Sequence, residues 1–533
     1  YYDESISPII QCASPGLGYT LNIYLTPGDC DDNYFYANPA QLEVLDNVDN
    51  NCDGFVDEDM HFTIDTTISR YILNEYLGYD VTPAGDLNND GFDDIVVGCY
   101  NYTGAYASAG AIMVFHGTAT GMNPIPVQII EGQEASGAFG CSLAADGDMN
   151  NDGYNDLIVG AELAEDVGAI NNYGQLYLHL GQPDGSFIEG YSFKVELGNI
   201  GGANFANKVR YAGDVNGDGY SDLVASIMNF SNGQTGEGAF YIRYGGPTGF
   251  GSGFTPESNQ ISAKLGTCVD GAGDVNNDGY DDVVATAKWY DGGQTDEGAI
   301  FVYYGASGGI PTTPDIILES NTINANLSVV SAAGDVNGDG FDDIIAGAPL
   351  YDGLISSDEG RVYIYHGSAT GFSASPNLIM PGMIGHTKWG ENVEGIGDVN
   401  GDGYDDIAIS SSVATNDHQV MIYVGSPSGI NTDVYSIVKG QQNFSFLGSG
   451  ISAAGDINGD GAHDFMIGDP YRLVEEFRDG AVYTYFGLCG NTYYADADLD
   501  GYGDPEVSTT GCTAPIGYVT NDLDCNDSNA EIK

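Results

Sequence analysis

Short apolar runs separated by polar, glycine-rich turns recur along most of the chain. Examples are the β-branched run Ile95-Val96-Val97 and the longer segment Ala299-Ile300-Phe301-Val302-Tyr303. Many of these runs are apolar throughout, which is typical of strands buried on both faces, and no 3.6-residue period indicates a helix. About four such segments fill each unit of roughly 60 residues. This pattern predicts an all-β fold in which each unit forms one four-stranded blade of a β-propeller.

A nine-residue segment of the form Asp-x-Asn-x-Asp-Gly-x-x-Asp separates two of the predicted strands in each unit. One copy could be an ordinary Asp/Asn/Gly turn. Repetition at a nearly constant period indicates a repeat architecture instead. The segment occurs seven times, at intervals of 58 to 66 residues, and begins at Asp86, Asp148, Asp214, Asp274, Asp335, Asp398 and Asp456.

The spacing of oxygen-bearing residues in this segment is that of a calcium loop. Carboxylates or an amide stand at positions 1, 3, 5 and 9, a glycine permits the sharp turn at position 6, and position 7 supplies a backbone carbonyl, as at the start of an EF-hand loop. Ca²⁺ takes about six to eight such oxygens. We therefore expect about seven Ca²⁺ ions in the repeats. Their candidate ligands are Asp86, Asn88, Asp90, Phe92 and Asp94; Asp148, Asn150, Asp152, Tyr154 and Asp156; Asp214, Asn216, Asp218, Tyr220 and Asp222; Asp274, Asn276, Asp278, Tyr280 and Asp282; Asp335, Asn337, Asp339, Phe341 and Asp343; Asp398, Asn400, Asp402, Tyr404 and Asp406; and Asp456, Asn458, Asp460, Ala462 and Asp464.

Composition adds a strong negative charge to this picture. The chain has 13 Lys and Arg against 77 Asp and Glu, a formal charge of -64, and 42% hydrophobic residues. Such a surface repels phosphate, so we expect no nucleic-acid partner. No apolar stretch of about 18 residues is present, so we expect no membrane insertion. Loops of this type suit the calcium concentration outside cells, and nine cysteines favour the same compartment, so we expect a secreted or cell-surface protein.

The order of the predicted strands suggests how the ring closes. The repeats occupy residues 60–488, between a Cys/Asp-rich segment at 1–59 and another at 489–533. The first unit begins with the extended segment 60–64, whereas the last unit ends on its third strand, at 481–486. We expect segment 60–64 to pair antiparallel with 481–486 as the missing outer strand, which removes the open edges. This pairing would bring Cys52 near Cys489, and we predict a disulfide between them, which requires Cα atoms within about 7 Å.

Residues on either side of the loops complete a family pattern. Phe139-Gly140 before a loop, the acidic segment itself, and Gly347-Ala348-Pro349 after a loop resemble the FG-GAP repeats of the integrin alpha-subunit head. The resemblance covers about four fifths of the chain. It implies a seven-bladed propeller that binds Ca²⁺ on one face, at the turn between the first two strands of each blade. The last unit departs from the pattern at Ala462-His463, but position 7 offers only its carbonyl, so we expect binding there as well.

Each end of the chain carries a further loop with the same spacing. Both ends resemble the "putative metal-binding motif" of large secreted bacterial proteins, which implies one or more cations in each. The candidate ligands are Asp49, Asn51, Asp53, Phe55 and Asp57 at one end and Asp496, Asp498, Asp500, Tyr502 and Asp504 at the other. From the internal symmetry of the two ends we expect disulfides Cys12–Cys30 and Cys512–Cys525. Because the second copy stops at Lys533, we expect the chain to continue in the gene or another copy to complete the module.

No catalytic constellation is visible in the sequence. His116, His179 and His366 recur near the end of the last strand of three units, and we interpret them as polar rim residues. We interpret Cys99, Cys141 and Cys268 as small buried core residues. Alternating tyrosines, such as Tyr363 and Tyr365, are interpreted as packing residues, although an exposed group of tyrosines would suit stacking on sugars.

The leading hypothesis is a non-enzymatic, calcium-stabilised extracellular surface protein with an adhesive or structural role. Its expected partners are other copies of itself, as in a head-to-tail filament, other surface proteins, or glycans. A second hypothesis is a secreted polysaccharide-binding or polysaccharide-degrading enzyme, which would need convergent acid and base groups in the central channel or on one face. A third is a transition-metal protein, which the all-oxygen ligands disfavour.

Overall fold

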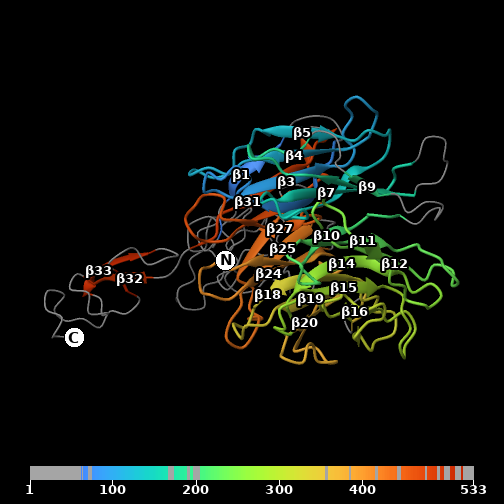
Figure 1. The fold of residues 1–533 in the computed structure, drawn as a ribbon. Helices are drawn as coiled ribbons and strands as arrows, with labels where there is room; N and C mark the ends of the chain where they lie inside the picture. Colours follow the sequence, from blue (N-terminus) through green and yellow to red (C-terminus); the bar gives the residue numbers. More distant parts are fainter. Residues whose placement is uncertain are drawn as a thin grey trace, which may run out of the picture.

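The computed structural model describes residues 62, 64–69, 75–165, 173–188, 193–195, 204–353, 358–382, 386–413, 418–440, 446–474, 477–488, 492–496, 504–510 and 518–519. Within these ranges all regular structure is β-strand, and no helix is long and apolar enough to cross a membrane. Seven sheets stand as blades around a common axis (Figure 1). The predicted all-β, seven-bladed propeller is confirmed.

In blades 1 to 6 the strands follow one another from the centre to the rim. Blade 1 contains β2 (Leu77–Gly85), β3 (Asp94–Cys99), β4 (Ala111–Phe115) and β5 (Gln128–Glu131); blade 2, β6 (Phe139–Gly147), β7 (Asp156–Ala161), β8 (Gln175–His179) and β9 (Phe193–Val195); blade 3, β10 (Val209–Gly213), β11 (Asp222–Ile227), β12 (Ala239–Arg243) and β13 (Gly253–Phe254). Blade 4 contains β14 (Leu265–Gly273), β15 (Asp282–Ala287), β16 (Ala299–Tyr303) and β17 (Ile316–Glu319); blade 5, β18 (Val329–Gly334), β19 (Asp343–Ala348), β20 (Arg361–Tyr365) and β21 (Leu378–Pro381); blade 6, β22 (His386–Thr387), β23 (Val393–Gly397), β24 (Asp406–Val413), β25 (His418–Tyr423) and β26 (Ser436–Lys439).

Blade 7 is assembled from both ends of the repeat region. It contains β27 (Ile451–Gly455), β28 (Asp464–Asp469), β31 (Ala481–Tyr485) and, as its outer strand, β1 (Ile64–Ile68). Two smaller sheets lie outside the blades. They are a hairpin of β29 (Leu473–Val474) and β30 (Phe477–Arg478), and a three-stranded sheet of β32 (Thr492–Ala495), β33 (Asp504–Thr510) and β34 (Tyr518–Val519).

The hydrophobic core is divided among the junctions between blades. Every residue of β3, β7, β11, β15, β19 and β28 is buried, because neighbouring blades cover both faces of these second strands. Seven clusters of buried side chains fill the seven junctions in the described part of the chain. Tyr363 and Tyr365 belong to the cluster between blades 4 and 5 and are almost fully buried, which confirms their interpretation as packing residues.

The aromatic-Gly and Gly-Ala-Pro elements of the repeat meet at the junction between blades 5 and 6. A Cβ on Gly347 in β19 would lie 2.2 Å from the carbonyl oxygen of Gly390 in the next blade. A Cβ on Gly468 of blade 7 would likewise lie 2.0 Å from the carbonyl oxygen of Gly78 in blade 1. Glycine is therefore required where the second strands of these blades touch the inner strand of the next, whereas blades 3, 4 and 6 carry Ser226, Thr286 and Ser410 at this position.

The ring closes between strands from the two ends of the repeats. β1 pairs antiparallel with β31, with Ile64 opposite Tyr485 and Ile68 opposite Val482, and Figure 1 shows the blue strand beside the orange one. The closure and its direction are as predicted, but the strand is Ile64–Ile68 rather than 60–64. Phe62 instead inserts its ring between blades, 4.9 Å from that of Phe465.

Because the closing strand supplies side chains to the junction between blades 7 and 1, its buried residue should matter for stability. Ile68 is 0% exposed, whereas Thr67 points to solvent. We predict that Ile68→Ala lowers the free energy of unfolding by about 2–4 kcal/mol and that Thr67→Ala changes it by less than about 0.5 kcal/mol. Chemical denaturation of both variants tests this, and equal effects would contradict the described closure.

Candidate metal sites

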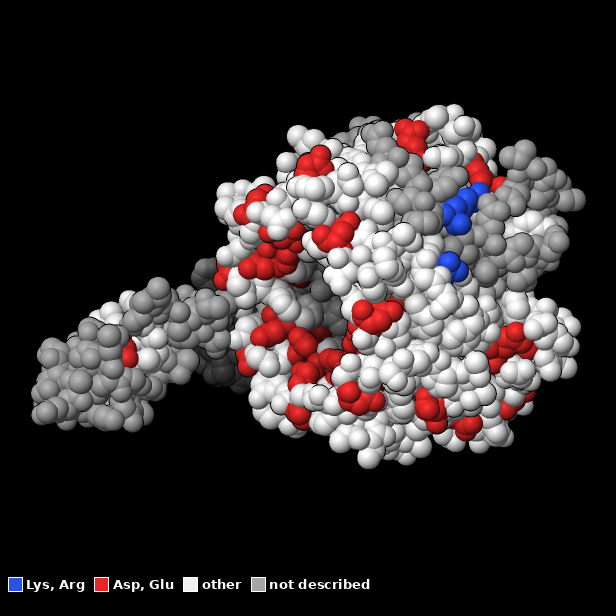
Figure 2. Space-filling view, viewed as in Figure 1, with Lys and Arg blue, Asp and Glu red and all other residues white. Residues whose placement is uncertain are grey.

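The calcium-loop candidates connect the first and second strands of the blades, at the same end of every sheet. We number each loop by its blade, so that loop 5 runs from Asp335 to Asp343 between β18 and β19. The inner strand shifts register just before this loop, where Ala332 pairs with Ile344 but Gly334 pairs with Asp343. Such a bulge turns the strand into the loop. In Figure 2, acidic side chains gather around the central hollow of the disc.

The carboxylates at positions 1 and 5 hold each loop in shape. In loop 5 the N–H groups of Asp339 and Gly340 donate to the two oxygens of Asp335, at 3.0 and 2.8 Å, and the N–H of Phe341 donates to Asp339, at 3.2 Å. The same three bonds occur in all seven loops, at 2.7–3.2 Å. In loop 7 the backbone N–H of Ala462 makes the third bond at 2.9 Å, so the departure from the family pattern leaves the turn intact.

The glycine at position 6 is required by the backbone conformation. Gly340 has a φ of +86°, and the equivalent glycines of the other loops lie between +88° and +92°. This left-handed region costs other L-residues roughly 1–2 kcal/mol. Glycine at position 6 therefore lets the loop make this turn without that cost.

Position 9 differs from the others because its side chain is fully buried. In loop 4, Asp282 accepts the N–H of Val275 at 3.1 Å and the N–H of Gly305, which follows the third strand, at 2.8 Å. The carboxylate therefore ties the first three strands of its blade together. The equivalent residues are also 0% exposed and accept the same glycine N–H at 2.8–2.9 Å; they are Asp94, Asp156, Asp222, Asp343, Asp406 and Asp464.

Burial has a strong effect on the protonation of these carboxyls. It raises the pKa of Asp94 and Asp156 to about 7, although nearby N–H donors and, for Asp94, His116 act in the opposite direction. It raises the pKa of the other five to about 8; these are Asp222, Asp282, Asp343, Asp406 and Asp464. The charged form is unfavourable because burial removes it from water, and the carboxylates at positions 1 and 5 add repulsion in most loops.

The remaining oxygens of the loops fit a hard cation. At position 3, Oδ1 of Asn88 and Oδ1 of Asn150 are buried and accept no hydrogen bond. A buried oxygen without a partner is unfavourable, whereas Ca²⁺ readily takes amide and carboxylate oxygens. Among the described residues no three His, Cys, Asp or Glu side chains converge tightly enough to chelate a metal. Binding would therefore require the loop carboxylates to turn from backbone N–H groups toward the ion.

In five of the seven loops the side chain at position 8 accepts an N–H from the loop of the preceding blade, a link that the sequence analysis missed. Oδ2 of Asp342 in loop 5 accepts the N–H of Asp274, the first residue of loop 4, at 2.8 Å. Oδ2 of Asp93 in loop 1 likewise accepts the N–H of Asp456 in loop 7, at 2.8 Å, and so links the ends of the ring. Equivalent bonds of 2.7–3.1 Å come from Asp281, Asp405 and Ser221. The aspartate that recurs at position 8 is the feature of the sequence that could have predicted these links.

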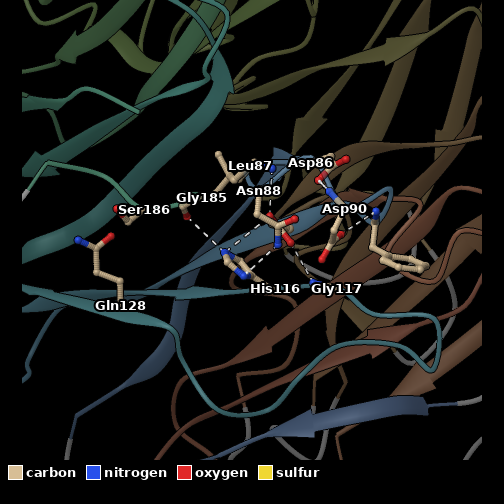
Figure 3. A network of polar contacts seen from close by, with 12 residues as sticks. Asp86, Leu87, Asn88, Asp90, His116, Gly117, Gln128, Gly185 and Ser186 are labelled. Atoms are coloured by element: carbon tan, nitrogen blue, oxygen red, sulfur yellow. Dashed lines mark hydrogen bonds and ion pairs between the residues drawn. The ribbon is translucent and has the colours of Figure 1, made fainter. Parts of the chain in front are cut away.

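The three histidines identified in the sequence are not equivalent. His116 and His366 immediately precede the glycine that follows the third strand, whereas His179 stands one residue earlier. His179 is 2% exposed and packs edge-on against Phe139, so its interpretation as a rim residue is wrong. His116 contacts loop 1, with its Nδ1 3.1 Å from Nδ2 of Asn88 (Figure 3).

Convergent charged groups, which were not found in the sequence, line the central channel. Arg210 of β10 lies between Asp80 of β2 and Asp270 of β14, with N–O distances of 3.6 and 4.0 Å. Asp146 and Glu394 line the same cavity, of about 270 Å³, together with Arg210 and Asp270. Each group comes from a different blade, so only closure of the ring brings them together.

The remaining sequence expectations concern cysteines and the two ends of the chain. Cys99, Cys141 and Cys268 are buried and form no disulfide, as expected of core residues. Asp496 and Asp504 lie at the facing ends of β32 and β33, which pair antiparallel, so the ninth candidate loop also connects two neighbouring strands. The other terminal candidates lie outside the described residues. These are Asp49, Asn51, Asp53, Phe55, Asp57, Asp498, Asp500 and Tyr502, and the expected disulfides Cys12–Cys30, Cys512–Cys525 and Cys52–Cys489.

The raised pKa values predict how the stability of the metal-free protein depends on pH. An unfolded Asp titrates near pH 4, so between about pH 4 and pH 8 the folded state binds more protons than the unfolded state and loses stability as pH rises. We expect the melting temperature in excess chelator to fall by at least ~5 °C from pH 5 to pH 8. Excess calcium should remove this fall, because the ion stabilises the ionised carboxylate.

Repulsion across the whole acidic surface would act in the same direction, so a matched pair of variants is needed. Asp343→Asn should reduce the pH dependence in chelator, whereas Asp433→Asn, at an exposed site, should leave it unchanged. Chelated protein that becomes more stable between pH 5 and pH 8 would contradict the assignment.

Comparison with known proteins agrees with this geometry. Residues 211–242, 270–303, 328–365 and 394–429 match the family described as "FG-GAP repeat", residues 148–225 match "FG-GAP-like repeat", and residues 29–58 and 524–533 match "Putative metal-binding motif". Integrin alpha-5 of Xenopus laevis is 32% identical over 148 residues, which are 26% of this chain and 14% of the integrin. Integrin alpha-3 of Cricetulus griseus is 32% identical over 172 residues, 31% of this chain and 15% of the integrin.

A third relative is integrin alpha pat-2 of Caenorhabditis elegans, 35% identical over 174 residues, which are 30% of this chain and 14% of the integrin. The alignments therefore span only about one seventh of these relatives. The chain carries FG-GAP repeats, folded as a seven-bladed β-propeller, with the "Putative metal-binding motif" at both ends.

Proposed function

We propose that this chain is a non-enzymatic, calcium-stabilised extracellular protein with an adhesive or structural role. The observation that carries the proposal is the fully buried carboxylate at position 9, which occurs in all seven blades beside the carboxylates at positions 1 and 5. Leaving such charges uncompensated is unfavourable. A divalent ion at each loop would offset this penalty and lock the first three strands of the blade.

Calcium is the cation that this chemistry favours. The candidate loops offer carboxylate, amide and backbone carbonyl oxygens, which suit Ca²⁺, whereas transition metals favour nitrogen and sulfur ligands. Extracellular calcium modules bind with dissociation constants of about 0.1–1 mM, and loops of this kind would be filled outside the cell. We therefore place the protein in the extracellular space or on the cell surface.

An adhesive or structural role follows from the similarity to integrin alpha chains over the propeller. The partners would be other surface proteins, glycans or further copies of this chain. The "Putative metal-binding motif" at both ends supports the last of these, because related modules at two ends of one disc can join copies head to tail. Such contacts would be heterologous, because each copy would use two different surfaces. They would build a filament unless the rotation between successive copies closes a ring.

The proposal predicts that stability and assembly both depend on calcium. At a free calcium concentration about fifty-fold above the dissociation constant, each site would add about 2 kcal/mol, and the sites act together. We expect chelation to lower the melting temperature by at least ~10 °C and to dissolve any filaments seen by negative-stain microscopy. Unchanged melting would refute calcium stabilisation, whereas monodisperse monomers in millimolar calcium would refute only the filament.

A polysaccharide-degrading enzyme remains the second candidate because of the charged groups in the channel. Burial raises the pKa of Glu394 to about 7. Burial also acts to raise the pKa of Asp80, but Lys208, Arg210 and hydrogen bonds outweigh it and lower that pKa. A protonated and an ionised carboxyl in one channel is the arrangement that glycoside hydrolysis uses. Arg210 lies between Asp80 and Asp270, however, and favours a structural role for this cluster.

Turnover of polysaccharides separates these two functions. We expect no hydrolysis or elimination by the intact chain across a panel of neutral and acidic polysaccharides, measured by reducing ends and by absorbance of unsaturated products. Turnover that is lost in Glu394→Gln, while the melting temperature is kept, would favour the enzyme and overturn the non-enzymatic proposal.

A further inference from the structure

His116 stands between loop 1 and a turn of the neighbouring blade. Its Nδ1 lies 3.1 Å from Nδ2 of Asn88, the position-3 residue of the loop, and its Nε2 lies 3.3 Å from the carbonyl oxygen of Gly185 in blade 2 (Figure 3). Nε2 is also 3.8 Å from Oδ2 of Asp94, the buried position-9 carboxylate. The imidazole therefore touches two candidate ligands of loop 1 and the adjacent blade at once.

These contacts determine which way the Asn88 amide faces. A carbonyl oxygen only accepts, so Nε2 of His116 must carry the proton that it donates to Gly185. Nδ1 then has a free lone pair, which accepts an N–H from Nδ2 of Asn88. The amide nitrogen is held toward the ring, and Oδ1, which is buried and accepts no hydrogen bond, is directed away from it.

In other loops the position-3 amide donates to a carboxylate of its own loop, and not to a residue outside the motif. In loops 2 and 6 the position-3 amide donates to the carboxylate at position 5, at 3.0 Å; the pairs are Asn150–Asp152 and Asn400–Asp402. In loop 5, Asn337 leans toward Asp343, at 3.4 Å. These acceptors are themselves expected ligands, so a cation must compete with the amide for them.

The turn that holds His116 is itself fastened to blade 1. The side chain of Gln128 in β5 donates to the carbonyl of Phe187, at 2.8 Å, and accepts the N–H of Phe187, at 2.9 Å. Gly185 has a φ of +77°, and a Cβ there would lie 2.7 Å from Cβ of Asn88. Ring and turn therefore fit closely against the loop, and Figure 3 shows the contact between Gly185 and His116.

We propose that His116 is a positioning residue that holds Asn88 ready to ligate a cation, and that loop 1 consequently binds calcium more tightly than loop 5, where Asn337 instead leans toward Asp343. The inference rests on the proposed calcium binding. It assigns loop 1 a role that the shared nine-residue motif does not encode, because the residue responsible lies outside the motif.

A reporter specific to one loop tests this proposal. Position 7 contributes its backbone carbonyl, and it is phenylalanine in loops 1 and 5, so Phe92→Trp and Phe341→Trp each place a tryptophan beside the candidate ion of that loop. The ring of Phe92 also lies against Gly459 of loop 7, so the loop 1 reporter chain additionally carries Asp456→Asn to remove the expected loop 7 site. Tb³⁺ bound there would emit on excitation of that tryptophan, and displacement by Ca²⁺ reports the affinity of the loop. The chain without these changes gives the background from Trp289 and Trp389.

Each tryptophan substitution is then combined with a substitution of the histidine next to its loop, and all affinities are measured at the same pH. His116→Phe keeps the ring but removes the acceptor, and loss of such an outer partner typically weakens metal binding by about 10–100-fold. We expect this loss for loop 1 with Phe92→Trp, and a large recovery with His116→Asn, whose amide oxygen can accept the N–H of Asn88. His366→Phe should change loop 5 by less than about threefold, since Nε2 of His366 has no hydrogen-bond partner.

The outcomes test the role of His116 separately from calcium binding at the loop. Unchanged affinity of loop 1 in His116→Phe, or an equal loss in loop 5 with His366→Phe, overturns the role of His116 while calcium binding stands. Failure of His116→Asn to recover the affinity in a chain with normal melting also overturns it, because packing alone would then explain the loss. No calcium-sensitive emission from Phe92→Trp refutes calcium binding at loop 1 itself.

Discussion

In each blade a buried aspartate carboxylate accepts the N–H of the glycine that follows the third strand, and in most blades it also accepts an N–H of the loop itself. The side chain begins the second strand, so one group connects three of the four strands. Its ionised form is unfavourable without a positive charge close by. The same group therefore organises the hairpin, and a cation bound at the loop, as proposed, would couple the fold to metal binding.

The blades are joined by a second set of repeated contacts. In five loops a position-8 side chain reaches the first residue of the preceding loop, and in four blades the second strand touches the next blade at a glycine. The junction between blades 7 and 1 uses these same contacts, through Asp93 with Asp456 and Gly468 with Gly78. The closing junction is thus equivalent to the others, although its partners are far apart in the sequence.

Seven loops with one motif nevertheless have different surroundings. Loop 1 has His116 beside its amide, and loop 5 has His366 at the same position, but only His116 is bonded to that amide and to the next blade. The inner strands differ as well, because the channel-facing positions carry Arg210 in blade 3, Asp270 in blade 4 and Glu394 in blade 6. The blades therefore differ at positions next to the loops and along the channel, where such differences can distinguish one site from another.

The sequence by itself determined the number of blades, the placement of each loop between two strands and the use of the N-terminal segment for closure. These depend on local pattern: apolar runs buried on both faces, Asp and Gly at set positions, and a missing outer strand. Only the tertiary structure decided the extent of that strand, because the packing of Phe62 between blades sets where pairing begins. It alone also brought together Arg210 with Asp80, and His116 with Gly185, because these contacts cross between blades and no spacing along the chain encodes them.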